Sequence, residues 1–139
     1  MIWFQNYSIE QINGILSQYM TGLLEIKATA IDSHSITATM PVNDKTRQPF
    51  GILHGGASVV LAESIGSIAS NLIIDPDIYK GVGLEINANH LRPVATGLVT
   101  AVCTAVHIGK PTHIWDVRIA DESGNLNCIS RLTVAIIPK

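Results

Sequence analysis

The sequence predicts an α+β fold in which a long, curved antiparallel β-sheet wraps around one central, buried helix. The helix is predicted from Ala57 to Ile73, a stretch without proline whose apolar residues cover most of the helical circumference. Four long segments rich in β-branched residues follow it, and short turns join them, as is typical of antiparallel strands. These segments span residues 81–91, 98–108, 114–120 and 126–137. A curved sheet around the helix would bury the apolar surface of both.

The first third of the chain adds a short N-terminal helix and two further strands. Ser8 and Gln11 form a capping-box pattern, which predicts a helix reaching about Met20. Strands are expected over 23–31 and over 35–42, where Ile36, Ala38, Met40 and Val42 alternate on one face.

Length and composition narrow the class of protein. With 139 residues, 47% of them hydrophobic, the chain fits one domain covering residues 1–139. The net charge of −2 gives no sign of a nucleic-acid partner. No apolar run is long enough to span a membrane, and residues 1–7 do not resemble a signal peptide. The two cysteines, Cys103 and Cys128, fall in apolar strand-like segments, so we expect a reduced, cytoplasmic protein.

Glu63 is an ionisable residue in the predicted central helix, at a position where stability alone would favour an apolar side chain. It is the only one between Gly55 and Ile74, and a buried carboxylate without a partner is costly. Glu63 either does chemistry, or pairs with a basic residue, or faces solvent on a thin polar stripe. Ser67 lies four residues on and shares its face, where it could orient a water molecule or bond back to its own helix.

The start of the same helix is a second candidate for catalytic chemistry. His54-Gly55-Gly56 places glycine at a helix N-terminus, where free N–H groups and the helix dipole could stabilise an oxyanion. Gln48 and His54 could polarise a carbonyl group or simply bond to the loop backbone. Gly55 and Glu63 are about 12 Å apart along the helix, too far for one carbonyl to contact both. If they serve one site, two chains must share it, as in a symmetric dimer.

Two stretches carry a family resemblance. Residues 48–67, QPFGILHGGASVVLAESIGS, and residues 82–92, VGLEINANHLR, resemble the hotdog-fold acyl-CoA thioesterases. The likeness extends over essentially the whole chain. It is closest to the enterobacterial branch of 1,4-dihydroxy-2-naphthoyl-CoA hydrolases and enterobactin-synthesis proofreading thioesterases.

The resemblance implies a hotdog fold, hydrolysis of acyl-CoA thioesters and a role for each matching residue. Glu63 would be the nucleophile or general base, the Gly55 N–H would polarise the thioester carbonyl, Gln48 and His54 would orient the thioester, and Ser67 would position water or the acyl group. The implied CoA contacts are Gly83, His90, Leu91, Arg92, Pro93, His107, Ile108, Gly109, Lys110, Pro111 and Thr112. We further expect a homo-oligomer, a dimer or a homotetramer built as a dimer of dimers, and a carrier-protein thioester as a possible substrate.

The same residues are compatible with two other functions. A hotdog 3-hydroxyacyl-thioester dehydratase would also use a histidine and a helix carboxylate, and a non-catalytic acyl-CoA-binding protein would need neither. The five histidines show no close metal-ligand spacing, so we expect no metal and no cofactor. Aromatic and fatty acyl groups suit the apolar helix equally well.

Overall fold

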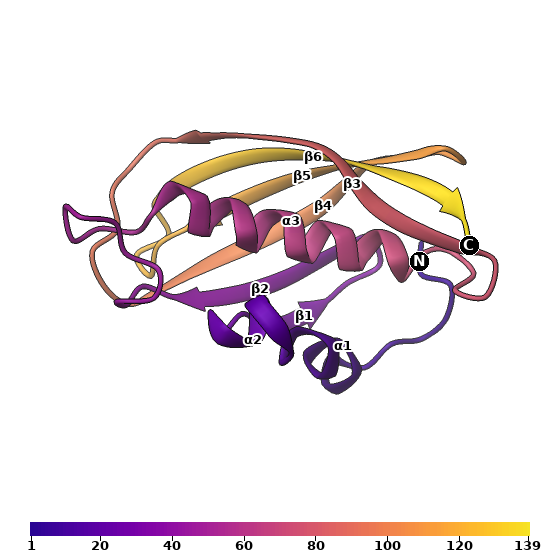
Figure 1. Cartoon of the computed structure of the whole chain (residues 1–139), viewed down its shortest axis with the longest axis horizontal. Helices are drawn as coiled ribbons and strands as arrows, with labels where there is room; N and C mark the ends of the chain where they lie inside the picture. Colours follow the sequence, from indigo (N-terminus) through magenta and orange to yellow (C-terminus); the bar gives the residue numbers. More distant parts are fainter.

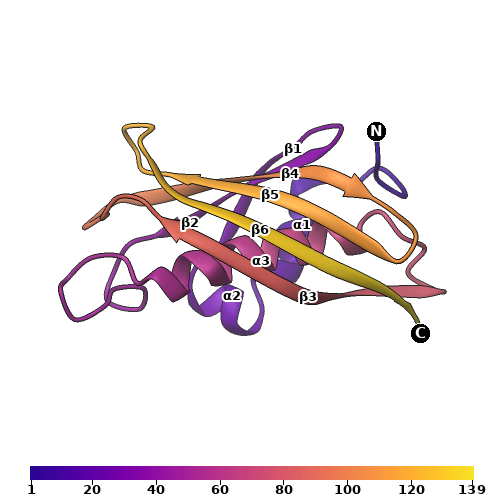
Figure 2. The same cartoon turned by 90° about the horizontal axis from the view of Figure 1, so that it is seen from above.

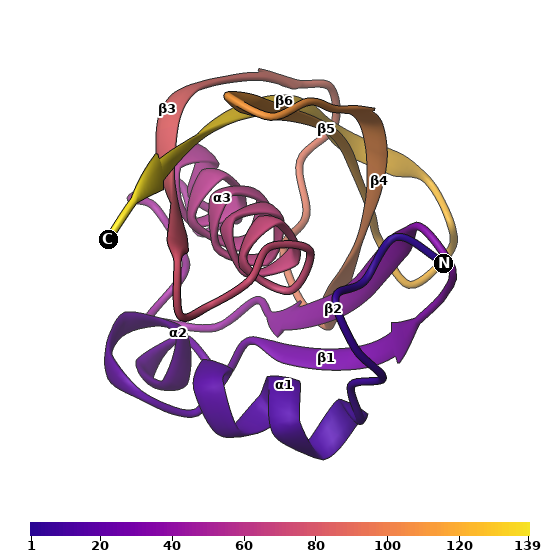
Figure 3. The ribbon, with the colours of Figure 1, turned by 90° about the vertical axis from the view of Figure 1, so that its right-hand side faces the viewer.

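A six-stranded antiparallel sheet curls around a single long helix in the computed structural model, which describes residues 1–139 (Figure 1). The strand order is β1-β2-β4-β5-β6-β3. The end view in Figure 3 shows the sheet passing around α3, with α1 and α2 outside it beneath β1 and β2. The elements are α1 (Ile9–Leu16), α2 (Tyr19–Leu23), β1 (Lys27–Ile31), β2 (Ser35–Pro41), α3 (Gly55–Asn71), β3 (Tyr79–His90), β4 (Leu98–Ile108), β5 (Thr112–Ala120) and β6 (Leu126–Pro138). The predicted fold class is confirmed.

Period-two alternation sends one face of each central strand into the core. Ile36, Ala38, Met40 and Val42 are all buried, as the sequence predicted for β2 and the residue after it. Figure 2 shows the long strands β4, β5 and β6 running side by side over the helix. They contribute nine further core residues, namely Val99, Ala101, Cys103, Trp115, Val117, Ile119, Cys128, Leu132 and Val134.

The N-terminal region differs from its prediction. The capping box of Ser8 and Gln11 is present, but the helix ends at Leu16 and a second short helix follows. Extended backbone at Gln18 and positive φ angles at Tyr19 and Glu25 interrupt the helical path. The first strand therefore begins at Lys27, four residues later than expected.

Burial along α3 is uneven, which corrects the expectation of a helix buried on nearly all sides. Leu61, Ala62 and Ile65 face the sheet and are buried. The opposite flank is only half-buried, and it combines Val60, Ile68 and other apolar side chains with Glu63 and Ser67. The single chain thus leaves an apolar stripe of its central helix partly uncovered.

The two edge strands of the sheet, β1 and β3, differ in whether another element covers them. Helix α1 covers the β1 edge, where the Asn13 side chain bonds both the N–H (2.8 Å) and the carbonyl (3.0 Å) of Ala28. No other strand pairs with the outer edge of β3. Val82 and Leu84 on β3 are 42% and 65% exposed. The β3 edge is therefore free to pair with another strand.

A buried hydrogen bond fixes α3 to the sheet, and its loss should be measurable. The Trp115 indole N–H donates to Ser70 Oγ at 2.8 Å, and both residues are fully buried. Ser70→Ala leaves that N–H unpaired, so we expect the free energy of unfolding to fall by about 1–3 kcal/mol. Urea denaturation would measure it, with Ser123→Ala in the exposed β5–β6 turn as the control. An unchanged value for Ser70→Ala would show that this bond contributes nothing.

Candidate active site

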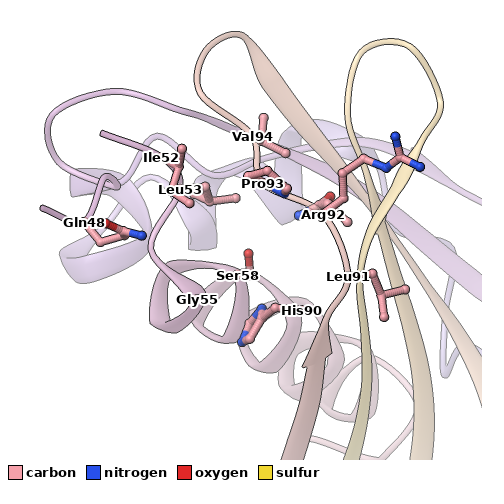
Figure 4. A pocket seen from close by; sticks show the side chains of 11 residues that line it. Gln48, Ile52, Leu53, Gly55, Ser58, His90, Leu91, Arg92, Pro93 and Val94 are labelled. Carbon is pink, nitrogen blue, oxygen red and sulfur yellow. The ribbon is translucent and has the colours of Figure 1, made fainter. Parts of the chain in front are cut away.

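The residues predicted for the site lie in three groups within the single chain. The first surrounds a cavity of about 490 Å³ at the N-terminal end of α3 (Figure 4). Its lining includes six of the predicted residues, namely Gln48, Gly55, His90, Leu91, Arg92 and Pro93, and His54 belongs to the same group as the N-cap of α3. The second group is Glu63, Ser67 and Gly83, and the third is the hairpin of residues 107–112.

At the N-terminus of α3, one backbone N–H is free to bind an anion. His54 is the N-cap residue, and its Nδ1 accepts a hydrogen bond from the Gly56 N–H at 2.8 Å. The Gly55 N–H has no hydrogen-bond partner within the chain. Because it lies at the positive end of the helix dipole, it can stabilise a developing oxyanion. An accepting Nδ1 also leaves the proton of a neutral His54 on Nε2, where it can be donated.

Gln48 is held in a similar way. Its Oε1 accepts a hydrogen bond from the Phe50 N–H, which orients the amide. The NH₂ group is then the free end, and Figure 4 shows it on the cavity side. The bond to backbone, one of the two alternatives that the sequence left open, is therefore present for both Gln48 and His54. Each side chain bonds to loop backbone, and that bond leaves a donor available for a carbonyl oxygen.

Glu63 has no partner inside the chain. Its carboxylate makes no hydrogen bond and no salt bridge, so Glu63 forms no structural ion pair within the chain. A Cβ atom at Gly83 would overlap Glu63 Oε1, which shows that the carboxylate lies directly over this glycine of β3. Ser67 is one turn further along the same half-buried flank, and its hydroxyl makes no hydrogen bond within the chain. A free carboxylate and a free hydroxyl are thus available to a substrate or a water molecule.

The oxyanion donor and the carboxylate are not brought together within one chain. Gly55 lies against His90, whose Nε2 would be 2.7 Å from a Cβ placed on Gly55. Glu63 lies against Gly83, which precedes His90 by seven residues on β3. Gly55 and Glu63 are about 12 Å apart along α3. The β3 residues against which they lie, His90 and Gly83, are about 23 Å apart along the strand.

The third group forms the β4–β5 hairpin at the other end of the helix. The Gly109 N–H donates to the Thr112 carbonyl at 2.9 Å, and the Pro111 carbonyl accepts from the Ile136 N–H at 2.9 Å. Ile108, Gly109 and Lys110 line a second cavity of about 430 Å³. Lys110 places an ammonium group there, which suits a phosphate.

The cysteine thiols and the potential metal-ligating side chains are not arranged for catalysis. Burial raises the pKa of both the Cys103 and the Cys128 thiol, which keeps them in the unreactive protonated form. No group of three or more His, Cys, Asp or Glu side chains could hold a metal ion.

Two buried polar residues of the first cavity escaped the sequence analysis. Ser58 and Asn127 are 1% and 3% exposed, and both line it. Asn127 did give a signal, as the only amide within the apolar start of β6, but nothing in the sequence placed it near Gly55. The fold does so, because the Asn127 carbonyl accepts from the Leu91 N–H at 2.8 Å.

The role of Gly83 can be tested by adding one methyl group. Gly83→Ala should push the Glu63 carboxylate away from its position and lower kcat/KM for a thioester at least tenfold, because small misplacements of a reacting group are costly. The control is Gly14→Ala in α1, where a Cβ meets no atom within 4 Å. Steady-state kinetics at matched thermal stability would check it, and a Gly83→Ala protein as active as Gly14→Ala would contradict this role.

Comparison with known proteins identifies the family to which the chain belongs. Residues 50–128 match the Thioesterase superfamily. The 1,4-dihydroxy-2-naphthoyl-CoA hydrolase of Escherichia coli is 49% identical over 137 residues, which cover 99% of this chain and all of that protein. The proofreading thioesterase EntH of Cronobacter sakazakii is 42% identical, with 99% of each chain covered. A crystal structure of a variant thioesterase from Pseudomonas aeruginosa superposes with a TM-score of 0.98 at 50% identity over the full length of both chains.

The chain therefore belongs to the Thioesterase superfamily, and the predictions of a hotdog fold and of a thioester hydrolase are confirmed. None of its helices has the length and apolar character that crossing a bilayer requires.

Proposed function

We propose that this protein is a cytoplasmic, single-domain enzyme that hydrolyses aromatic or fatty acyl-CoA thioesters with Glu63 as the catalytic carboxylate. The observation that carries the proposal is the unpartnered Glu63 carboxylate over Gly83, on the same helix whose first N–H is free to bind an oxyanion. The CoA hydrolase named for Escherichia coli, at 49% identity, supports CoA as the carrier. A carrier-protein thioester, which the sequence analysis gave as a possible substrate, is the second kind of thioester to test.

Two chemical routes to thioester hydrolysis use the same side chains and backbone N–H. Glu63 can attack the thioester carbonyl, expelling the thiolate and forming a mixed anhydride, which water then opens to the carboxylic acid. Alternatively, Glu63 removes a proton from a water molecule near Ser67, and that water attacks the carbonyl directly. In both routes the Gly55 N–H stabilises the oxyanion, while Gln48 and His54 donate hydrogen bonds to the thioester. Both routes leave a free thiol and a carboxylate.

The site is proposed to be shared between two chains. An antiparallel β3–β3 pairing about a two-fold axis near residues 86–87 would place Gly83 of one chain beside His90 of its partner. Glu63 would then face the Gly55 N–H of the other chain, which resolves the separation within one chain. The open β3 edge and the half-buried apolar flank of α3 support this pairing, since both would be covered by it.

The CoA moiety is proposed to extend from this shared site to cationic groups of both chains. His90, Leu91, Arg92 and Pro93 of one chain and the hairpin residues 107–112 of the other would bind its pantetheine and phosphates. A homotetramer, a dimer of two such dimers, remains our expectation for the full assembly.

The activity is tested by a panel of benzoyl, phenylacetyl and fatty acyl thioesters, on CoA and on carrier protein, with release of free thiol as the readout. We expect turnover of at least one class and a preference that identifies the acyl group. An enoyl-CoA in the same panel separates the dehydratase alternative, which would hydrate the double bond and release no thiol. Binding of all thioesters without thiol release would contradict the proposed function.

A further inference from the structure

The side chain of Asn71, the last residue of α3, reaches across to the backbone of β3. Its Oδ1 accepts a hydrogen bond from the Gly81 N–H at 2.9 Å, and its Nδ2 donates to the Gly81 carbonyl at 3.0 Å. The same Nδ2 donates to the Ser67 carbonyl at 2.8 Å, one turn back in the helix. A Cβ atom at Gly81 would lie 3.2 Å from Nδ2, so the glycine leaves room for this close approach.

These bonds fall on the side of β3 that faces away from the rest of the sheet. The neighbouring strand is β6, where Gly81 pairs with Ile136. The Ile136 N–H donates to the Pro111 carbonyl, so this pair is of the type that exchanges no hydrogen bonds across an antiparallel ladder. The N–H and carbonyl of Gly81 consequently point outward, and Asn71 occupies both in place of a further strand.

The segment held by Asn71 leads directly to the glycine beneath the candidate catalytic carboxylate. Gly83 follows Gly81 by two residues on β3, and a Cβ there would overlap Glu63 Oε1. Asn71 and Glu63 are two steps of four residues apart on α3, which places both on the flank beside β3 (Figure 3). Without the Asn71 bonds, this part of β3 would have hydrogen-bonded support from β6 alone.

We infer that Asn71 is a positioning residue that holds Gly83 against Glu63 and so keeps the carboxylate in its reactive position. This inference rests on the proposed function. It adds a residue that belongs to neither the catalytic nor the CoA-binding set predicted from the sequence, and that acts through Gly83. Because a displacement of about 1 Å in a reacting group can cost about a hundredfold in rate, a small shift of β3 would lower turnover.

A second asparagine supplies a matched control at the opposite edge of the sheet. Asn13 makes the same pair of bonds to the N–H and carbonyl of Ala28 on β1, at 2.8 and 3.0 Å. Asn71→Leu and Asn13→Leu each remove such a pair, so each should lower the melting temperature. Only Asn71→Leu should also lower kcat, by about tenfold on the most rapidly cleaved acyl-CoA of the panel, with KM within about twofold of wild type.

Two further variants separate an action through Gly83 from a general loss of structure. Adding Gly83→Ala to Asn71→Leu should lower kcat no more than about twofold below the less active single variant, because both changes disturb the same contact. Gly81→Ala places a Cβ 3.2 Å from both Asn71 Nδ2 and Val134 Cγ1. It should lower kcat by about threefold with Asn71 retained, and it replaces Asn71→Leu if that variant does not fold.

The outcomes separate the inference from the function on which it rests. Wild-type kcat in a folded Asn71→Leu protein overturns the inference, and so does an equal loss of kcat in Asn13→Leu. Losses that multiply in the double variant also overturn it, since Asn71 would then act independently of Gly83. If Asn71→Leu does not fold, wild-type kcat in Gly81→Ala has the same meaning. A wild-type protein that releases no thiol from any thioester contradicts the proposed function, and the inference falls with it.

Discussion

Glu63→Gln should lower kcat for thioester hydrolysis by at least about 10³-fold while leaving the fold intact. The amide is nearly isosteric, but it can neither attack the carbonyl nor remove a proton from water. Little stability should be lost, because the carboxylate makes no hydrogen bond or salt bridge within the chain. Steady-state thiol release and thermal denaturation, measured on the same preparation, would check both parts.

The matched control for this change is Glu10→Gln, the same substitution at an exposed position in the first turn of α1. It should retain wild-type kinetics. A folded Glu63→Gln protein with kcat near that of Glu10→Gln would remove Glu63 from the mechanism. A protein that loses activity only because its melting temperature collapses would assign Glu63 a structural role instead.

Mixing two inactive variants should restore activity if two chains share each site. Glu63→Ala and Gln48→Ala place their lesions on opposite sides of the proposed interface. In a mixed dimer one site carries both lesions and the other carries none. Random pairing makes about half of the dimers mixed, each with one intact site, so roughly a quarter of wild-type activity should return after joint unfolding and refolding.

The experiment has an internal control and one requirement. Glu63→Ala mixed with Glu63→Gln should remain inactive, because every site then lacks the carboxylate. Gln48→Ala alone must be strongly impaired for recovery to be visible. If it is, and the Glu63→Ala and Gln48→Ala mixture stays as inactive as its parents, each site is built within one chain and the proposed β3 pairing is wrong.

The sequence predicted the parts of the fold that depend on local patterns. The apolar helix, the alternation in β2 and the long strands appear nearly at their expected positions, because periodicity and turn residues determine them. The break between α1 and α2 was missed, since the extended backbone at Gln18 and the positive φ at Tyr19 leave no signature in residue type. Glu63 could be singled out because a lone charge on an apolar helix conflicts with stability.

Other features of the site depend on contacts between distant residues. Gly83 could be assigned only by resemblance, and its packing against Glu63 emerged from the way β3 crosses α3. Asn127 joins the cavity through a bulge, an irregularity of pairing that a single strand does not encode. The half-buried apolar flank of α3 was not predicted, because hydropathy does not distinguish a face that packs in the core from an apolar face that the single chain leaves partly uncovered.

The open edge of β3 has a consequence for how the protein behaves at low abundance. A newly synthesised or highly diluted chain exposes unpaired backbone groups next to Val82 and Leu84, and such an edge can pair with any other extended chain. The proposed pairing of two copies would bury this edge, and the paired fraction would rise with protein concentration. Specific activity and resistance to heat should therefore decline together on dilution, with one common midpoint.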